Sequence, residues 1–165
     1  METNSFPELV NKYFRYLIDE FQYSISEKPY GPRPFNYGEI FFNSNTTIIK
    51  IVRDQSRPLD IISVVIKPKN APDDAEMSLI RIVEAFGIDH HFLAAINPRD
   101  LEKSIEDYAW GLREYFMEFI LGDFTRWNSV LTYFINYMKR DYLAMSGSEL
   151  PEGAYRAIEE YINHH

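Results

Sequence analysis

The fold is decided by residues 37–67, which read YGEIFFNSNTTIIKIVRDQSRPLDIISVVIK. Ile, Val and Phe are concentrated in three runs, at residues 37–43, 46–53 and 59–67, as is typical of β-strands. Short segments rich in Asn, Ser, Asp and Pro separate the three runs. Because connections this short can join only antiparallel neighbours, the stretch predicts a β-meander.

Alternation within these strands predicts how the sheet is buried. In the third run Ile62, Val64 and Ile66 share one face, and Leu59, Ile61 and Val65 share the other; the second run likewise has apolar residues on both faces. A sheet with one face in water would alternate more cleanly between apolar and polar residues. We therefore expect partial cover on both faces, with the first helix on one side and later helices, or another subunit, on the other.

The residues before the meander predict a helix and an edge strand. Ser5, Pro7 and Glu8 form a plausible helix start, and apolar residues then recur every three or four positions as far as residue 21. Residues 23–26 alternate between apolar side chains and serine, and several prolines follow, which is typical of an edge strand leading into a loop.

The residues after the meander predict four more helices. The first covers about 74–86 with a stop at Gly87, and the second starts at Asn97 and Pro98 and stops at Gly122. The third covers about 125–145 with a stop near Gly147, and the last runs from Pro151 through Ile162. The predicted fold is α+β: an N-terminal helix on a three- to four-stranded antiparallel meander, followed by about four helices. We expect a single domain over 1–165, with a strand half at about 1–68 and a helical half at about 73–163.

Composition excludes several classes of function. The 165 residues are 45% hydrophobic and 16% aromatic, so a globular core rich in rings is expected. Acidic residues outnumber basic ones 25 to 17, and the formal charge of −8 argues against a nucleic-acid surface and favours a cationic partner. Cysteine is absent, and neither a signal peptide nor an apolar run long enough for a bilayer stands out. The expectation is a soluble cytoplasmic protein without membrane contact.

The sequence offers few residues for chemistry. Asp89, His90 and His91 are the only local candidates for metal binding, but adjacent side chains on regular structure point apart, so no metal site is predicted. The terminal His164 and His165 are either native or the remnant of a purification tag, and they are set aside for that reason. No nucleophile elbow or phosphate-binding glycine loop occurs. We therefore predict no catalytic residue, no cofactor and no enzyme activity.

The predicted third helix carries two apolar stripes. One stripe contains Leu101, Ile105, Tyr108, Leu112, Tyr115, Phe116 and Phe119. The opposite stripe contains Trp110, Met117 and Leu121 and is flanked by charged residues. Either the helix is buried on both sides, or the Trp110 stripe faces outward as a partner site. Burial is favoured, because the fourth helix has its own ring-rich face, which must pack against another apolar surface.

Part of the chain resembles a family. Residues 9–21 (LVNKYFRYLIDEF), the strands at 37–42, 48–54 and 60–66, and the segment LGDF at 121–124 followed by Trp127 look like small bacterial proteins of unknown or immunity-like function from polymorphic toxin systems. The likeness covers about half of the chain. It implies a cytoplasmic protein that binds a cognate toxin and occludes its active site without catalysis.

The leading hypothesis is therefore a non-enzymatic bacterial protein-binding domain, and the resemblance implies an immunity protein for a basic toxin. The predicted partner-binding residues are aromatic and acidic side chains of the C-terminal helices: Trp110, Glu114, Glu118, Asp123, Tyr133 and Tyr137. The alternative is a small hydrolase or ligand-binding protein whose site lies between sheet and helices and uses Asp89, His90 and His91. Monomer and homodimer both remain open, the homodimer forming through a sheet face or the Trp110 stripe.

Overall fold

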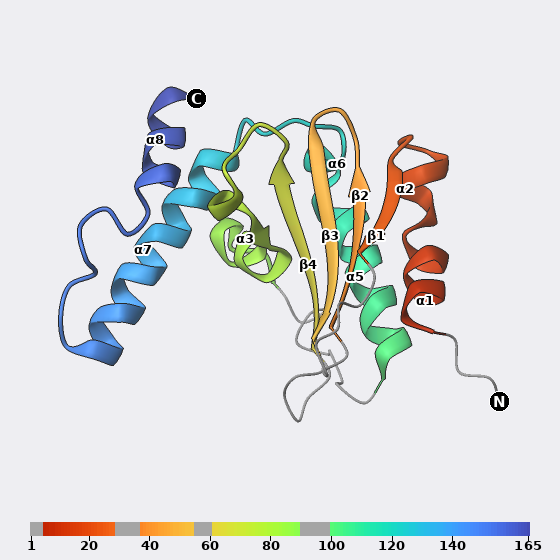
Figure 1. Ribbon diagram of the computed structural model, residues 1–165, viewed down its shortest axis with the longest axis horizontal. Coiled ribbons are helices and arrows are strands. Elements are labelled where there is room, and N and C mark those ends of the chain that lie inside the picture. Colours follow the sequence, from red (N-terminus) through yellow and green to blue (C-terminus); the bar gives the residue numbers. More distant parts are fainter. Residues whose placement is uncertain (1–4, 29–36, 55–60, 90–99) are drawn as a thin grey trace.

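The computed structural model describes residues 5–28, 37–54, 61–89 and 100–165, and its centre is a five-stranded sheet (Figure 1). The strands lie in sequence order and each pair is antiparallel, which confirms the predicted meander and edge strand. The strands are β1 (Ser24–Lys28), β2 (Tyr37–Asn43), β3 (Thr47–Asp54), β4 (Ile61–Pro68) and β5 (Met77–Ser78). The last strand lies in the half of the chain that we expected to be helical, because its two residues pair with β4 just before a helix begins.

One face of the sheet is buried along β2, β3 and β4, and the register explains which residues form it; Ile25 of the edge strand β1 lies on this face but is exposed. Ile49 of β3 pairs with Phe42 of β2 and with Ile66 of β4, and all three side chains are excluded from solvent. Ile51 and Val64 continue this row along the strands. The alternation of the sequence therefore grouped Ile62, Val64 and Ile66 on one face correctly, but it did not predict that this face is the buried one.

The opposite face of the sheet is only partly exposed, and charged pairs lie over it. Lys50 donates to the Glu76 carboxylate at 2.8 Å and Lys67 to Asp73 at 2.6 Å, so both lysine stems cover the apolar side chains between them. We expected the later helices, or another subunit, to cover the face opposite the first helix; for the later helices this is wrong, because α5 packs beside α1, and cover by another subunit stays a prediction. Alternation reports that a face is half-buried, but not which element buries it.

The first predicted helix is two helices. The Glu8 carboxylate accepts a hydrogen bond of 2.6 Å from the backbone N–H of Ser5 and so caps α1 (Phe6–Tyr13), as the sequence predicted. The helix ends at Phe14, which is fully buried against Phe42 of β2 with 6.0 Å between ring centroids. Helix α2 (Arg15–Asp19) then continues on the same face of the sheet.

The predicted third helix also has a break. Helix α5 (Leu101–Tyr115) starts at Asp100, whose carboxylate accepts from the backbone N–H of Lys103 at 2.9 Å, whereas the expected start at Asn97 lies outside the described residues. It ends at Phe116, and α6 (Met117–Ile120) follows. Phe116 is fully buried, so the core determines where the helix bends.

Three further helices lie at the β5 end of the sheet. They are α3 (Leu79–Phe86), α7 (Trp127–Ser146) and α8 (Arg156–His164). Gly87 and Gly147 end α3 and α7 in the left-handed conformation, as the sequence predicted. The last helix begins at Arg156 and not at Pro151, because residues 152–155 form turns.

The predicted α+β class is thus confirmed, and Figure 1 shows how the helices are distributed. Helices α1, α2, α5 and α6 lie on the buried face of the sheet, and α7 and α8 form the end of the molecule beyond α3. Within the described ranges, every helix is too short or too polar to cross a bilayer.

The core is rich in rings, as the composition predicted. Phe119 is stacked on Phe116 and Phe124 and meets Trp127 edge to face, with ring centroids 5.2–6.1 Å apart. These ring contacts connect the end of α5, helix α6 and the start of α7.

Candidate functional site

The candidate partner surface lies on the outward side of α5. Trp110 has 49% of its surface exposed and meets the ring of Tyr115 edge to face at 5.6 Å between centroids. The expectation that the Trp110 stripe is buried is therefore wrong, and so is the burial of Tyr115, which is 40% exposed. Leu121 of the same stripe is also exposed, while Met117 is partly buried.

The rotation of α5 about its axis explains why Trp110 faces outward. Ile105, Tyr108 and Leu112 occupy the opposite side of the helix and are fully buried against the sheet and the N-terminal helices. The hydroxyl of Tyr16 in α2 donates to the carbonyl oxygen of Ala109 at 3.1 Å. Because these contacts use one side of α5, residue 110 is turned to the solvent.

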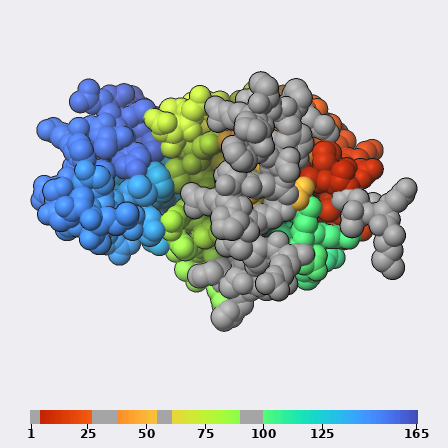
Figure 2. Space-filling view, turned by 60° about the horizontal axis from the view of Figure 1, so that its bottom comes forward, coloured from red at the N-terminus to blue at the C-terminus, as the bar shows by residue number. Residues whose placement is uncertain are grey.

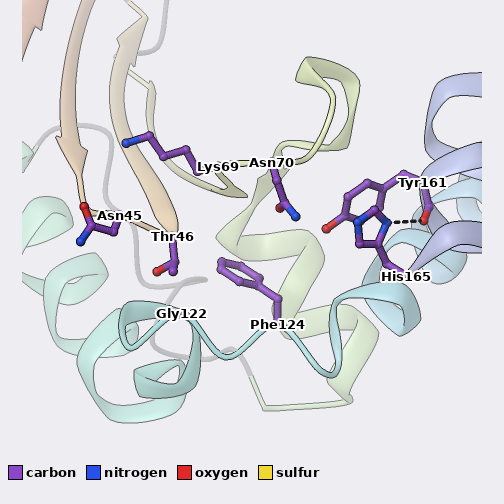
Figure 3. A pocket seen from close by; sticks show the side chains of 8 residues that line it. All are labelled: Asn45, Thr46, Lys69, Asn70, Gly122, Phe124, Tyr161 and His165. Atoms are coloured by element: carbon purple, nitrogen blue, oxygen red, sulfur yellow. Dashed lines mark hydrogen bonds between the residues drawn. The ribbon is translucent and has the colours of Figure 1, made fainter.

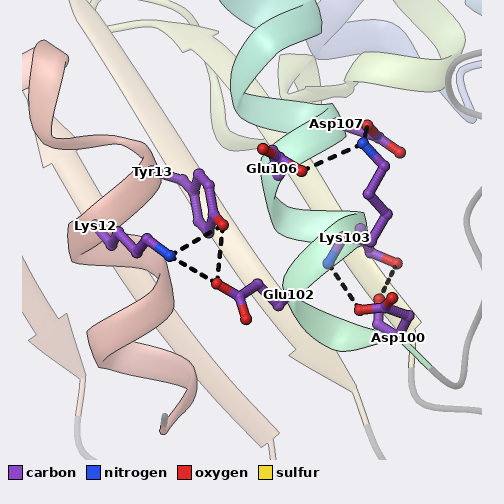
Figure 4. Close-up of polar contacts among 8 residues, drawn as sticks. Lys12, Tyr13, Asp100, Glu102, Lys103, Glu106 and Asp107 are labelled. Carbon is purple, nitrogen blue, oxygen red and sulfur yellow. Dashed lines mark hydrogen bonds and ion pairs between the residues drawn. The ribbon is translucent and has the colours of Figure 1, made fainter.

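Polar contacts fix the start of α5 as well (Figure 4). The Glu102 carboxylate accepts hydrogen bonds from Lys12 Nζ at 2.7 Å and from the Tyr13 hydroxyl at 2.8 Å. The bond from Lys12 holds the pKa of the Glu102 carboxyl below its ordinary value. The next residue, Lys103, pairs with Asp107 at 2.7 Å and with Glu106 at 3.2 Å, so the charged groups of this part of the helix are engaged with one another.

Charge at the centre of the surface is not balanced. Arg113 pairs with Glu20 of the segment after α2 at 2.7 Å. Glu114, exposed and one turn after Trp110, has no ion pair with any residue that the structure describes. An aromatic ring beside an uncompensated carboxylate is suited to a partner that presents a basic, partly apolar side chain.

Two other predicted residues, Glu118 and Asp123, interact with neighbouring groups of this chain. Glu118 Oε1 lies 3.3 Å from Arg126 Nη1, and Arg126 also lies over the Phe86 ring at 3.7 Å. The Asp123 carboxylate accepts a hydrogen bond of 3.0 Å from the backbone N–H of Thr125 and a short one from its hydroxyl, which lowers the pKa of Asp123. Both groups help to position the segment between α6 and α7, and their role toward a partner stays a prediction.

The remaining two predicted residues lie elsewhere. Tyr133 and Tyr137 are half-buried on α7, and the Arg81 guanidinium of α3 covers the Tyr137 ring at 3.8 Å. In Figure 1, α7 lies on the far side of α3, whereas α5 lies beside α1. The six residues therefore occupy two regions, of which only the one around Trp110 and Glu114 combines exposure with uncompensated charge.

The second candidate site is a cleft of about 540 Å³ at the end of the sheet (Figure 3). It lies between the β2–β3 turn, the segment after β4, the segment after α6 and the end of α8. Its lining residues are Asn45, Thr46, Lys69, Asn70, Gly122, Phe124, Tyr161 and His165. None was singled out as a ligand-binding residue from the sequence, because four separate segments contribute to the cleft.

Some polar groups of the cleft make hydrogen bonds within the protein, and others do not. Lys69 Nζ donates to the carbonyl oxygen of Ser44 at 3.0 Å, and His165 Nδ1 lies 3.1 Å from the carbonyl oxygen of Tyr161. The amide groups of Asn45 and Asn70 make no hydrogen bond within the part of the chain that the structure describes. Burial raises the pKa of the Tyr161 hydroxyl, which stays protonated as a donor at neutral pH.

The alternative site from the sequence cannot be placed. Asp89 is exposed, while His90 and His91 lie outside the described residues. Among the described residues no group of three or more His, Asp or Glu side chains is arranged to hold a metal ion. A site at Asp89, His90 and His91 stays a prediction.

Comparison with known proteins adds no relative. No protein-family model matches the chain, no curated protein is similar to it, and no solved structure matches its fold.

Proposed function

We propose that this chain is a non-enzymatic protein-binding domain and that its partner docks on α5 around Trp110 and Glu114. The observation that carries the proposal is the half-exposed Trp110 on a helix whose other side is completely buried. A tryptophan contributes a large apolar area with few rotamers to lose, and such residues dominate the energy of many interfaces. The rigid attachment of α5 to α1, α2 and the sheet presents it in a fixed orientation.

Charge supports a basic partner. The chain carries a formal charge of −8, and the carboxylate of Glu114 beside Trp110 is not compensated within the described residues. A negative surface accelerates the approach of a positively charged protein and selects against acidic ones. An immunity protein that covers a basic toxin has these requirements, and the sequence resemblance points to the same class.

The experiment is affinity capture from the native host with matched variants. We expect a basic protein to be recovered with the wild-type chain and lost with Trp110→Ala, because removing a central tryptophan costs about 2 kcal/mol or more, roughly a thirtyfold loss of affinity. Glu114→Lys should weaken the same complex through its association rate. Ile80→Ala, which truncates an exposed apolar residue of α3, is the control and should retain the partner. Equal recovery with Trp110→Ala would contradict the proposal.

Immunity function has its own test. Co-expression with a toxin encoded next to this reading frame should leave cells viable with the wild-type chain or Ile80→Ala, and not with Trp110→Ala. If Trp110→Ala protected cells as well as the wild type while remaining folded, the toxin would have to be neutralised elsewhere on the molecule.

A second candidate function is the binding of a small polar ligand in the cleft. The specific observation is that two unpaired asparagine amides and one lysine face a space of about 540 Å³, a size that suits a small metabolite. Phe124 and Tyr161 supply apolar walls (Figure 3). No side-chain carboxylate lines the cleft among the described residues, so a ligand with a carboxylate or phosphate group would suit it best.

This candidate can be tested by NMR. Titration with a panel of small carboxylates and phosphates should shift the amide resonances of Gly122 and Asn70 for a true ligand, and Asn70→Ala should weaken its binding. Shifts confined to exposed lysines elsewhere would show nonspecific ion binding and would remove this candidate.

A further inference from the structure

A stack of aromatic rings in the core ends at the cleft. Phe119 is stacked on Phe116 with 10° between the ring planes, and Phe124 is stacked on Phe119 with 17° between the planes and 5.4 Å between the centroids. The Trp127 ring is nearly perpendicular to both, and its centroid lies 5.2 Å from that of Phe119 and 5.4 Å from that of Phe124. Because these two distances are almost equal, Trp127 lies beside the stack and not at its end. The stack therefore ends at Phe124, which lines the cleft.

The end of this stack is accessible. Phe116 and Phe119 are excluded from solvent, whereas Phe124 is only partly buried. Figure 3 shows the Phe124 ring between Thr46 on one side and Tyr161 on the other. A further planar ring can be added to the stack here, in the offset arrangement that aromatic pairs favour.

The segment that carries Phe124 is held in place by its neighbours. Gly122 has φ of 84° and lies so close to the β2–β3 turn that a Cβ there would collide with the Thr46 side chain. The Asp123 carboxylate accepts a hydrogen bond of 3.0 Å from the backbone N–H of Thr125. The ring is thus presented to the cleft in a fixed orientation, which lowers the entropic cost of stacking a ligand on it.

The polar groups of the cleft are hydrogen-bond donors. The side-chain amides of Asn45 and Asn70 and the hydroxyl of Tyr161 make no hydrogen bond with a described residue. Figure 3 shows the Asn70 amide and the Tyr161 hydroxyl pointing into the same space. Lys69 adds a positive charge and donates one of its three N–H groups to the carbonyl oxygen of Ser44. These groups suit an anionic substituent on a stacked ring.

We propose that the cleft selects a planar aromatic ring that carries a carboxylate or phosphate group, with the ring stacked on Phe124. This assignment rests on the cleft being a ligand site, the second function proposed above, and specifies which ligands it prefers. An aliphatic acid would lose the stacking on Phe124. A neutral aromatic compound would lose the attraction of Lys69.

The cleft and the surface around Trp110 belong to different regions of the molecule. Figure 2 shows that α7 and α8 form one end, with the N-terminal helices at the other. Helix α8 supplies Tyr161 to the cleft, whereas Trp110 lies on α5 beside α1. Binding of a small ligand and docking of a protein can therefore be measured separately.

The experiment compares matched probes on the wild-type chain by amide NMR. Benzoate and cyclohexanecarboxylate have the same charge, but only benzoate is planar and aromatic; AMP and ribose 5-phosphate form a second pair that differs by the base. Benzoate and AMP should shift the amide resonances of Gly122 and Asn70 with dissociation constants about threefold to tenfold lower than those of their non-aromatic counterparts. Benzamide and adenosine, which keep the ring and lack the negative charge, should also bind more weakly than benzoate and AMP.

Three variants assign the preferences to residues. Phe124→Leu keeps an apolar side chain and should abolish the preference for benzoate over cyclohexanecarboxylate. Lys69→Gln should instead reduce the preference for benzoate over benzamide. Tyr142→Leu, which removes an exposed ring of α7 outside the cleft, is the control and should bind every probe like the wild type. The amide spectrum of each variant shows whether its fold is retained.

Each failure has its own signature. Equal binding of benzoate and cyclohexanecarboxylate by the wild type would overturn the proposed aromatic ligand and leave the cleft as a general anion site. Equal binding of benzoate and benzamide would overturn the anionic substituent. If no probe shifted the cleft resonances, the cleft would not be a site for such ligands at all. The comparison of probes on the wild type needs no substitution, so it decides the question even if Phe124→Leu does not fold.

Discussion

The hydroxyl of Thr47 donates a hydrogen bond of 2.8 Å to the carbonyl oxygen of Phe119, and both residues are excluded from solvent. This bond joins the first residue of β3 to α6. Close by, the Tyr23 hydroxyl donates to the carbonyl oxygen of Ile120, also at 2.8 Å. Two carbonyl groups in the last turn of α6 thus accept hydrogen bonds from side chains of the sheet and of the segment before β1, and that of Phe119 also accepts from the Gly122 N–H at 3.1 Å.

Replacement of Thr47 by valine tests this connection. Thr47→Val keeps the shape of the side chain but removes one of the two donors to the buried Phe119 carbonyl oxygen and leaves only the Gly122 N–H at 3.1 Å, which should lower the free energy of unfolding by about 1 kcal/mol. Urea denaturation followed by far-UV circular dichroism measures the change. Thr132→Val, at an exposed position of α7, is the control and should stay within about 0.5 kcal/mol of the wild type.

Alanine at Gly122 should be more harmful than alanine at Gly87. Both glycines have positive φ, 84° and 63°, so each substitution incurs backbone strain of about 1–3 kcal/mol. A Cβ at residue 122 would also lie 2.2 Å from Thr46 Oγ1, whereas a Cβ at residue 87 would meet nothing within 4 Å. Thermal midpoints of the two variants give the comparison. Equal decreases in the two thermal midpoints would show that the Thr46 side chain moves aside without a cost in stability.

The two tryptophans should behave oppositely. Trp127 is 1% exposed and Trp110 is half-exposed. Trp127→Ala should cost about 3–5 kcal/mol of stability, because it opens a cavity in the ring cluster, and Trp110→Ala should cost much less. In the single-tryptophan variants made with phenylalanine, acrylamide should quench Trp110 strongly and Trp127 weakly. Strong quenching of Trp127 would contradict the described packing of α7.

The contact between α1 and α5 should depend on pH. Hydrogen bonds from Lys12 and Tyr13 lower the pKa of Glu102, so its contribution is complete above the ordinary carboxyl value of 4.5 and is lost as pH falls through the lower folded value. The same bond raises the pKa of Lys12, so the contribution is retained up to the ordinary lysine value of 10.5.

The measurement is the urea midpoint of the wild type and of Glu102→Gln across acidic and neutral pH. The wild type should be more stable at neutral pH, and the difference should vanish in acid. Glu160→Gln, at an exposed position of α8, is the control and should show no such dependence. A difference that persisted in strong acid would mean that the substitution acts through packing.

Sequence reasoning was most successful where the signal is local. The alternation placed Ile62, Val64 and Ile66 on one face of β4, and the capping residues Ser5 and Glu8 identified the start of α1. It was least successful at Phe14 and Phe116. The helical spacing of apolar residues continues through both positions, yet each ring is buried in the core and the helix ends there. A helix break that arises from long-range packing leaves no local signal.

The candidate sites show the same division. Trp110 was identified as a possible contact residue from its position opposite the core stripe, but its exposure could not be decided, because the sequence does not say which helix covers which. The cleft at Asn45, Asn70 and Tyr161 was missed altogether, since its lining comes from turns and helix ends distant in sequence.

By itself the sequence determined the antiparallel meander, the ring-rich core, the acidic charge and the stops at Gly87 and Gly147, since strand alternation, composition and helix ends are properties of neighbouring residues. Only the tertiary structure decided that α1 and α5 share one face of the sheet, that Trp110 faces outward and that the end of α7 extends beyond the body. These features depend on contacts between segments up to about a hundred residues apart, such as Tyr23 with Ile120, and chain folding alone brings such segments together.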